Sequence, residues 1–96
     1  MRISFNPLAE RELNEAAQFY ERESAGLGAA FISEIEHTCA QITEYPEAAR
    51  VVLGSIRRRL LRRFPYAVLY RLHDDSVRIL AVMNLKRRPA YWIDRS

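Results

Sequence analysis

Arginine is the residue type in this sequence whose number and spacing could do chemistry. Two basic clusters lie in the second half of the chain, Arg57-Arg58-Arg59-Leu60-Leu61-Arg62-Arg63 and Lys86-Arg87-Arg88, and Tyr91 and Trp92 follow the second cluster. A guanidinium group binds phosphate or carboxylate through two parallel hydrogen bonds and can stabilise charge in a phosphoryl transition state. Its pKa, above about 12, keeps it protonated and makes it a poor proton-transfer group. The clusters therefore favour binding of an anionic partner over acid–base catalysis.

Charge is divided by position along the chain. Nine acidic and three basic residues precede Arg50, whereas three acidic and twelve basic residues occupy the chain from Arg50 onward. A basic surface on an otherwise ordinary domain indicates a polyanion or an acidic protein as partner. Two alternatives stay open at this point, a merely solvated face and arginines that pair with the carboxylates of the first half.

Acid–base candidates near the basic clusters are few. Tyr91, His73 and Lys86 are the only ones close in sequence, and His73 stands beside Asp74 where a turn role is also consistent. An RNA-cleaving site built on arginine would still need a tunable base and acid. The chain shows no glycine-rich phosphate loop, no Cys/His set with metal spacing, and no serine or cysteine with a base partner. We therefore expect no metal and no other cofactor, and enzymatic activity stays uncertain.

Length and composition predict one domain over residues 1–96. Hydrophobic residues make up 49% of the 96 residues, which is too high for a disordered chain. No stretch resembles a signal peptide or is long enough to span a bilayer, so we expect a soluble, cytoplasmic protein without a membrane partner. Cys39 is the only cysteine. It is expected to be a free thiol in the core, in agreement with a reducing compartment.

The first half of the chain has the periodicity of two helices. A short strand is predicted over Arg2–Phe5, and Asn6-Pro7 then has the composition of a helix start. Apolar residues recur with helical spacing from Ala9 to Tyr20, with acidic residues on the outer face. Two glycines interrupt the pattern before a second helical period runs from Leu27 to Ile42 and ends near Tyr45-Pro46. The two helices are predicted to form an antiparallel hairpin.

The second half of the chain has short runs rich in strand-forming residues. Strands are predicted at Ile56–Arg63, Tyr66–His73 and Val77–Asn84, with a tight turn at Asp74-Asp75. The last two runs are apolar on both faces and should lie in the middle of the sheet, whereas the arginine-rich run should expose at least one face. We expect a short helical turn near the C-terminus that packs Trp92 and leaves Tyr91 exposed. The fold class is thus α+β, an N-terminal helical hairpin packed on a small, mainly antiparallel sheet.

A family resemblance extends over nearly the whole chain. It is carried by Phe19-Tyr20, Gly26-Leu27-Gly28 with Phe31, the segment Leu61-Arg62-Arg63-Phe64-Pro65-Tyr66-Ala67-Val68-Leu69-Tyr70-Arg71, and Lys86-Arg87-Arg88-Pro89 with Trp92 and Arg95. With these motifs the sequence resembles the RelE/ParE family of toxins from bacterial type II toxin–antitoxin systems. The resemblance implies a helical hairpin against a small antiparallel sheet. It also implies a cognate antitoxin whose C-terminal segment wraps the toxin and masks its active surface.

The family divides into ribosome-dependent mRNA endonucleases and ParE-like toxins that poison DNA gyrase. For the ribonuclease branch, the resemblance implies Arg57, Arg59, Arg62, Arg87 and Tyr91 as catalytic residues. This sequence departs from that branch because its predicted strands carry no lysine and Asn84 stands where many relatives have histidine.

The Arg-Arg-Pro and Trp tail is closer to the ParE-like, plasmid-stabilisation side, so we expect a toxin that acts on DNA gyrase. An mRNA interferase that cleaves ribosome-bound mRNA is the alternative, followed by a non-toxic relative with antitoxin or nucleic-acid binding. The residues expected to bind the target are Arg57, Arg59, Arg62, Arg63, Lys86, Arg87, Arg88, Tyr91 and Trp92.

Overall fold

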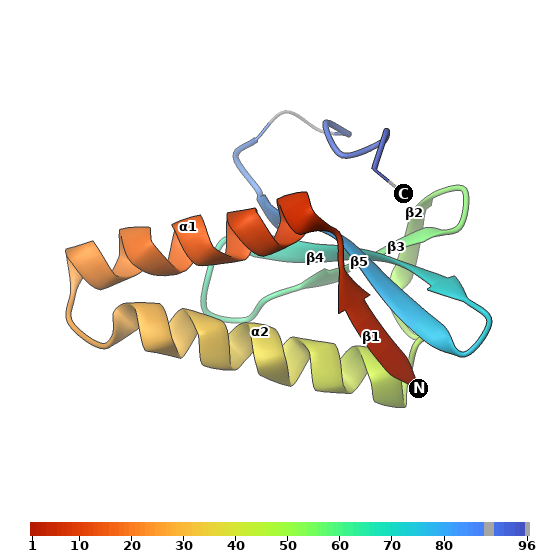
Figure 1. The fold of residues 1–96 in the computed structure, drawn as a ribbon, viewed down its shortest axis with the longest axis horizontal. Helices are drawn as coiled ribbons and strands as arrows, with labels where there is room; N and C mark the ends of the chain where they lie inside the picture. The colour runs from red at the N-terminus through yellow and green to blue at the C-terminus, as the bar shows by residue number, and fades with distance from the viewer. Residues whose placement is uncertain (88–89, 96) are drawn as a thin grey trace.

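Two helices and five strands form the fold of this chain. The computed structural model describes residues 1–87 and 90–95. The elements are β1 (Arg2–Phe5), α1 (Pro7–Glu23), α2 (Leu27–Glu44), β2 (Arg50–Leu53), β3 (Ile56–Leu60), β4 (Tyr66–His73) and β5 (Ser76–Asn84). The strands lie in the order β1-β5-β4-β3-β2, and only the pairing of β1 with β5 is parallel. The helices pack as a hairpin along one side of this sheet (Figure 1), which confirms the predicted α+β class.

The start of α1 is set by local sequence. The Asn6 side chain accepts a hydrogen bond of 2.8 Å from the Leu8 N–H, and Pro7 occupies the first helical turn, where a missing N–H costs nothing. Ala9, Ala16 and Ala17 are buried against the sheet and the second helix. Both the strand before this helix and the helix itself were predicted with these starting residues.

The two helices approach each other closely at Gly28. A Cβ atom added at Gly28 would lie 2.4 Å from the Ala17 carbonyl oxygen. The Glu21 carboxylate of α1 accepts hydrogen bonds from the N–H groups of Gly26 and Gly28, at distances from 2.9 to 3.1 Å. Gly26 itself has φ of 87°, a left-handed conformation that favours glycine. The Gly-Leu-Gly motif therefore serves the tight connection between the helices.

Replacement of Gly28 by alanine is expected to destabilise the fold by about 1 to 3 kcal/mol, because the added methyl group meets backbone of α1 that cannot move away alone. Urea unfolding followed by circular dichroism measures this loss. Ala29→Ser, at the exposed neighbouring position, is the matched control and should change the free energy of unfolding by no more than about 0.5 kcal/mol. Equal stability of the two variants would contradict a close contact at Gly28.

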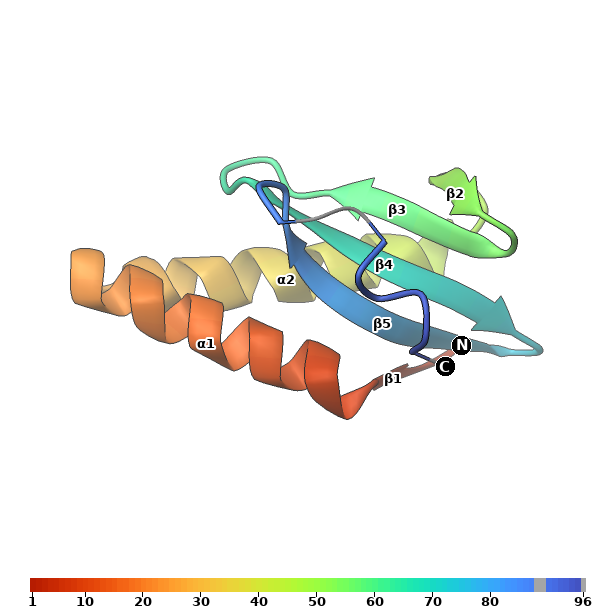
Figure 2. The ribbon, with the colours of Figure 1, turned by 90° about the horizontal axis from the view of Figure 1, so that it is seen from above.

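Both faces of the central strands are covered. On the helix side, Phe31, Ile35 and Ile42 of α2 pack with Val68 and Tyr70 of β4 in the larger core. The other face holds a second cluster formed by Ile56, Ala67, Leu69, Leu80, Ala81, Met83 and Trp92. The C-terminal segment, residues 90–95, crosses this face (Figure 2). Its own Trp92 is only 5% exposed because the indole packs in this second cluster. The apolar character of β4 and β5 on both faces is thereby explained.

The arginine-rich strand is shorter than predicted. β3 ends at Leu60, so Arg62 and Arg63 lie in the loop at residues 61–65 and not on a strand. The pairing with β4 continues in register for one more hydrogen bond, from the Leu61 N–H to the Tyr66 carbonyl. It stops there because the N–H groups of the next two residues both bind the Glu34 carboxylate of α2.

Two further predictions were incomplete or wrong. The strand β2 was not predicted, since its four residues show no alternation of polar and apolar side chains. The expected helical turn at the C-terminus is a pair of backbone turns, closed by hydrogen bonds from Ile93 to Ala90 and from Arg95 to Trp92.

Candidate functional site

The two basic clusters of the sequence meet at one end of the sheet. β3 and β5 both run antiparallel to β4, so both end where β4 begins. The loop at residues 61–65 and the turn that follows β5 therefore adjoin, and the Leu85 N–H donates a hydrogen bond of 2.9 Å to the Pro65 carbonyl. We call Arg62, Arg63, Lys86 and Arg87 the basic end. All four side chains are exposed, whereas Arg88, also expected at this surface, lies outside the described residues.

The loop of the basic end is fixed through its backbone. Glu34 accepts the N–H groups of Arg62 and Arg63, the second at 3.0 Å. Phe64 is only 7% exposed and packs against Tyr20 and Phe31, with ring centroids 4.8 and 5.0 Å apart. Because the backbone and Phe64 hold the loop, both guanidinium groups point outward without being needed for the fold. Phe64 itself is a core residue and offers no stacking surface to a target.

Arg57 has a structural task that the sequence did not reveal. One of its guanidinium nitrogens donates to the carbonyls of Glu47 and Ala49, at 3.1 and 2.8 Å. Nearby, the Tyr70 hydroxyl donates to the Pro46 carbonyl at 2.7 Å. Burial raises the pKa of this hydroxyl, against the opposing effect of Arg57 and Arg59. The connection between α2 and β2 is held by these contacts, so Arg57 is not a free member of a target-binding surface.

The arginines of β3 divide between the two faces of the sheet. Arg57 and Arg59 pair with Tyr70 and Val68, which belong to the helix-side core. Arg58 pairs with Leu69 and faces the side covered by the C-terminal segment. The structure thus separates Arg58 from the two neighbours that sequence spacing groups with it.

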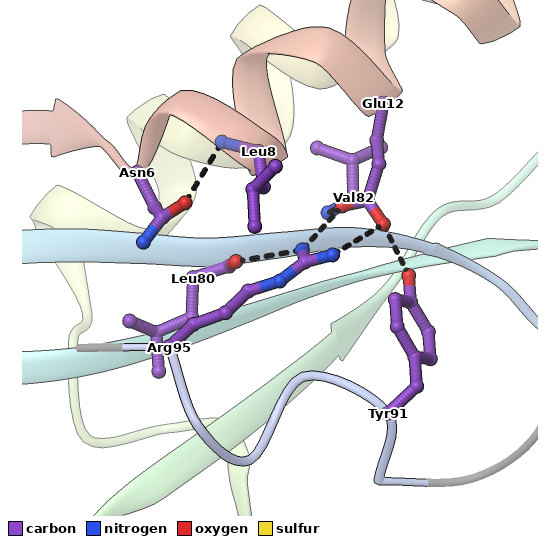
Figure 3. Close-up of polar contacts among 7 residues, drawn as sticks. All are labelled: Asn6, Leu8, Glu12, Leu80, Val82, Tyr91 and Arg95. Carbon is purple, nitrogen blue, oxygen red and sulfur yellow. Dashed lines mark hydrogen bonds and ion pairs between the residues drawn. The ribbon is translucent and has the colours of Figure 1, made fainter.

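Tyr91 is held by Glu12 of α1, as Figure 3 shows. The Tyr91 hydroxyl donates to Glu12 Oε2 at 2.6 Å, and the Arg95 guanidinium forms an ion pair with the same carboxylate at 2.8 Å. The Cζ atoms of the Arg87 and Arg95 guanidinium groups lie 4.2 and 5.0 Å from the centroid of the Tyr91 ring. Burial, together with the hydrogen bond to Glu12, raises the pKa of the Tyr91 hydroxyl. The prediction of an exposed Tyr91 was wrong because this network half-buries it.

Glu12 also completes the sheet. β1 ends at Phe5, so the outer edge of β5 continues beyond its partner. There the Glu12 carboxylate accepts the Val82 N–H at 3.0 Å, and Arg95 donates to the Leu80 carbonyl at 3.1 Å. Sequence reasoning placed Glu12 on the acidic outer face of α1. Its spacing from the buried Ala9 and Ala16, three and four residues away, is the signal that would have placed it on the inner side.

Trp92 does not belong to an exposed target-binding surface. It is 5% exposed and forms part of the core on the second face of the sheet. The predicted packing of Trp92 in the C-terminal segment is confirmed. The expected contact between Trp92 and a target stays a prediction, and it requires this segment to leave the sheet. Its neighbour in this segment, Ile93, is 48% exposed.

The histidines lie at different ends of the molecule. His73 forms an exposed pair with Asp74, 3.6 Å apart, at the turn between β4 and β5. This turn is at the opposite end of the sheet from Arg62 and Arg63. His37 of α2 instead lines a shallow depression with those two arginines. Among the described residues, no group of histidine, cysteine and acidic side chains could hold a metal ion.

Two hollows adjoin these elements. One of about 310 Å³ lies between α1 and the end of β5, with Phe19, Tyr66, Asn84 and Arg87 among its lining residues. The other, of about 500 Å³, is apolar and lies between β1 and the two helices, lined by Met1, Ile3, Phe5, Leu13, Ile32, Ile35, Glu36, Cys39, Ala40 and Thr43. Cys39 is buried as expected, and burial raises the pKa of its thiol to about 11.

Comparison with known proteins identifies a family and solved structures of similar fold. The family model described as ParE toxin of type II toxin–antitoxin system, parDE, matches residues 3–89. A chain of the chromosomal ParDE TA system from P. aeruginosa is similar in fold, with a TM-score of 0.64 and 14% sequence identity over 88% of this chain and 95% of that chain. No curated protein matches. Within the described part of the chain, no helix is long and apolar enough to cross a membrane.

Proposed function

This chain belongs to the ParE toxin family of type II toxin–antitoxin systems, and on that premise we propose that it inhibits DNA gyrase in the cytoplasm and is neutralised by a cognate antitoxin. The observation that carries the choice of gyrase over mRNA is the engagement of Tyr91. Its hydroxyl donates to Glu12 at 2.6 Å, and its pKa is raised, so it neither ionises as a base nor offers a free proton to a leaving group. A gyrase inhibitor needs a charged, rigid surface and no such group.

The basic end is the surface proposed to contact gyrase. Arg62, Arg63, Lys86 and Arg87 are exposed on backbone that Glu34, Phe64 and the Leu85–Pro65 hydrogen bond hold in place. A surface whose backbone is already ordered loses less conformational entropy when it binds. The hollow between α1 and β5 adds the exposed ring of Phe19, 49% accessible, beside Arg87.

The antitoxin is proposed to use the apolar hollow between β1 and the helices. Exposed apolar side chains of Met1, Ile3 and Ile32 border it, and its lining is mostly hydrocarbon. Such a groove fits the apolar face of an amphipathic helix, while acidic side chains of the same partner would meet the basic end. The sheet edges offer a further site for a strand of the partner.

We expect the chain to copurify with the product of a neighbouring gene when both are expressed together, because a partner that fills an apolar groove and neutralises four cations dissociates slowly. Affinity purification on a tag carried by the partner, with a denaturant wash as the last step, measures this. Ile32→Asp should weaken the complex, and Glu23→Gln, at an exposed position of α1, is the control. A toxin that elutes as a free monomer beside an intact partner would contradict the proposal.

The Tyr91→Phe variant separates the two target classes. We expect it to keep inhibiting gyrase supercoiling, because the ring remains under Arg87 and only the hydroxyl is lost. The lost hydrogen bond to a carboxylate should lower stability by about 1.5 to 3 kcal/mol, so assays belong at a temperature where circular dichroism shows a folded protein. Toeprinting on translating ribosomes is expected to show uncut mRNA with both proteins. Codon-positioned cleavage that disappears in Tyr91→Phe or Arg87→Ala would establish an mRNA interferase instead.

A further inference from the structure

Four arginines outside the basic end lie together on the face of the sheet that the helices do not cover. Arg58 pairs with Leu69, Arg71 pairs with Ile56, and both of these partners belong to the core cluster on the face opposite the helices. Arg50 is paired with Arg58, and Arg78 is paired with Arg71, so all four share one face. We call these residues the sheet-face arginines. They come from β2, β3, β4 and β5, and no cluster in the sequence groups them.

The pairing of these arginines is unfavourable for the isolated fold. Arg50 lies directly opposite Arg58, and Arg71 lies directly opposite Arg78. Like charges at directly opposite positions destabilise a sheet. The ion pairs among the described residues join Glu12 to Arg95 and His73 to Asp74, so none of the sheet-face arginines pairs with a described carboxylate. Arg78 does bind Ser4 Oγ and the Phe5 carbonyl, at 3.2 and 3.1 Å, through one nitrogen.

Acidic residues are concentrated in the other layer of the molecule. Eight of the nine acidic residues that precede Arg50 lie in α1 or α2, and the remaining one, Glu47, lies in the connection that follows α2. A polyanion that approaches the face opposite the helices therefore meets positive charge first, because the helices that carry these acidic residues lie on the other side of the sheet (Figure 2). Charge of this arrangement steers an anionic ligand towards one orientation.

We propose that the sheet-face arginines bind the phosphate backbone of duplex DNA without regard to sequence. Guanidinium groups bind phosphate oxygens through paired hydrogen bonds. The four arginines lie on four adjacent strands, with the Arg71–Arg78 pair offset by two residues along the strands from the Arg50–Arg58 pair. Across the strands they span three strand spacings, about 14 Å, which is close to the width of about 12 Å of the major groove. This binding goes beyond the proposed inhibition of gyrase and does not depend on it.

The face favours a duplex over a single strand. Proteins that hold single strands stack bases on exposed aromatic rings. Here Trp92 is 5% exposed, and the Tyr91 ring is covered by Arg87. The large exposed aromatic residues that the structure describes, Phe19 and Tyr45, belong to the helical layer. The described segment that crosses this face, residues 90–95, forms backbone turns and no helix that could enter a groove, so contacts to base edges are not expected.

Fluorescence anisotropy with a labelled duplex of about 20 base pairs tests the proposal over a series of salt concentrations. Each phosphate contact contributes a slope of about −0.9 to the dependence of log K on log salt, so four contacts give a loss of affinity of about 100-fold for a fourfold rise in salt. The double variant Arg58→Gln/Arg71→Gln is expected to bind at least about 10-fold more weakly and to lose about two units of slope.

The matched control removes the same charge from the helical layer. Arg11→Gln/Arg22→Gln changes two exposed arginines of α1 and should keep the slope of the unmodified chain. Urea unfolding separates a binding role from a structural one. Removal of one arginine from each like-charge pair should leave the unfolding midpoint of Arg58→Gln/Arg71→Gln unchanged or raised, whereas a structural role would lower it.

Four outcomes would overturn the proposal. They are no binding of the duplex even at low salt, an equal loss of affinity in the two double variants, tighter binding of the matching single strand than of the duplex, and binding of a poly-glutamate peptide that displaces the duplex and depends on the same two arginines. The last result would assign the face to an acidic protein.

Discussion

Removal of the charge at the basic end is expected to abolish growth inhibition while the protein stays folded. The variant carries Arg62→Gln, Arg63→Gln, Lys86→Gln and Arg87→Gln. These side chains are exposed, and the contacts that hold their loop come from backbone N–H groups and from Phe64. Each exposed substitution should change the free energy of unfolding by no more than about 0.5 kcal/mol. Growth after induction in cells, and supercoiling by purified gyrase, measure the loss of function.

Arg57→Gln gives the necessary contrast to this variant. It removes one positive charge as well, but from a guanidinium that binds the carbonyls of Glu47 and Ala49. We expect it to lower stability and to leave toxicity in place wherever the protein remains folded. If the fourfold variant inhibited growth as strongly as the unmodified chain, with an unchanged circular dichroism spectrum, the basic end would be a solvated surface and not the working one.

Glu12→Ala is expected to destabilise the protein by about 3 to 5 kcal/mol, because it leaves the charge of Arg95 without its partner in a site where both side chains are about one-seventh exposed. The Val82 N–H and the Tyr91 hydroxyl lose their acceptor at the same time. Small domains have a total stability of about 5 to 15 kcal/mol, so this is one of the largest effects available to a single substitution here.

Trp92 reports directly on this change. It is the only tryptophan in the chain and is a buried residue of the C-terminal segment, which is bound to Glu12 through Arg95. Its fluorescence in Glu12→Ala should shift to longer wavelength at a lower urea concentration than the loss of helical circular dichroism. Glu15→Ala, an exposed change one turn further along α1, is the control and should match the unmodified chain. A loss below about 1 kcal/mol for Glu12→Ala would show that water replaces the network without cost.

Most elements of this fold were predictable because their signals are local. The cap at Asn6-Pro7, the break at the glycines and the apolar run of Tyr66–His73 each depend on a few neighbouring residues. The end of β3 was not predictable in this way. It depends on Glu34, which lies 28 residues from Arg62 and competes for the N–H groups that a longer strand would have used. β2 escaped prediction because its four residues show no alternation of polar and apolar side chains.

The sequence predicted that the candidate site is rich in arginine, but it identified only some of the residues that form the site. Sequence spacing grouped Arg57 to Arg63 as one surface, and Arg62 and Arg63 do meet Lys86 and Arg87 at the basic end. Arg57 instead donates hydrogen bonds to backbone carbonyls, and Trp92 is buried. The Tyr91 hydroxyl binds the carboxylate of Glu12, which lies 79 residues away in the sequence.

The sequence by itself determined the α+β class, the family and the excess of guanidinium groups in the second half, since periodicity, motifs and charge are properties of the chain. Only the tertiary structure decided which of these groups are free. An arginine beside backbone carbonyls, such as Arg57, is engaged within the fold, whereas one placed by strand register opposite another arginine, such as Arg58 or Arg71, has a charge that the described fold does not neutralise. Strand register and helix packing set these neighbours through contacts between distant segments, which no local pattern of residues records.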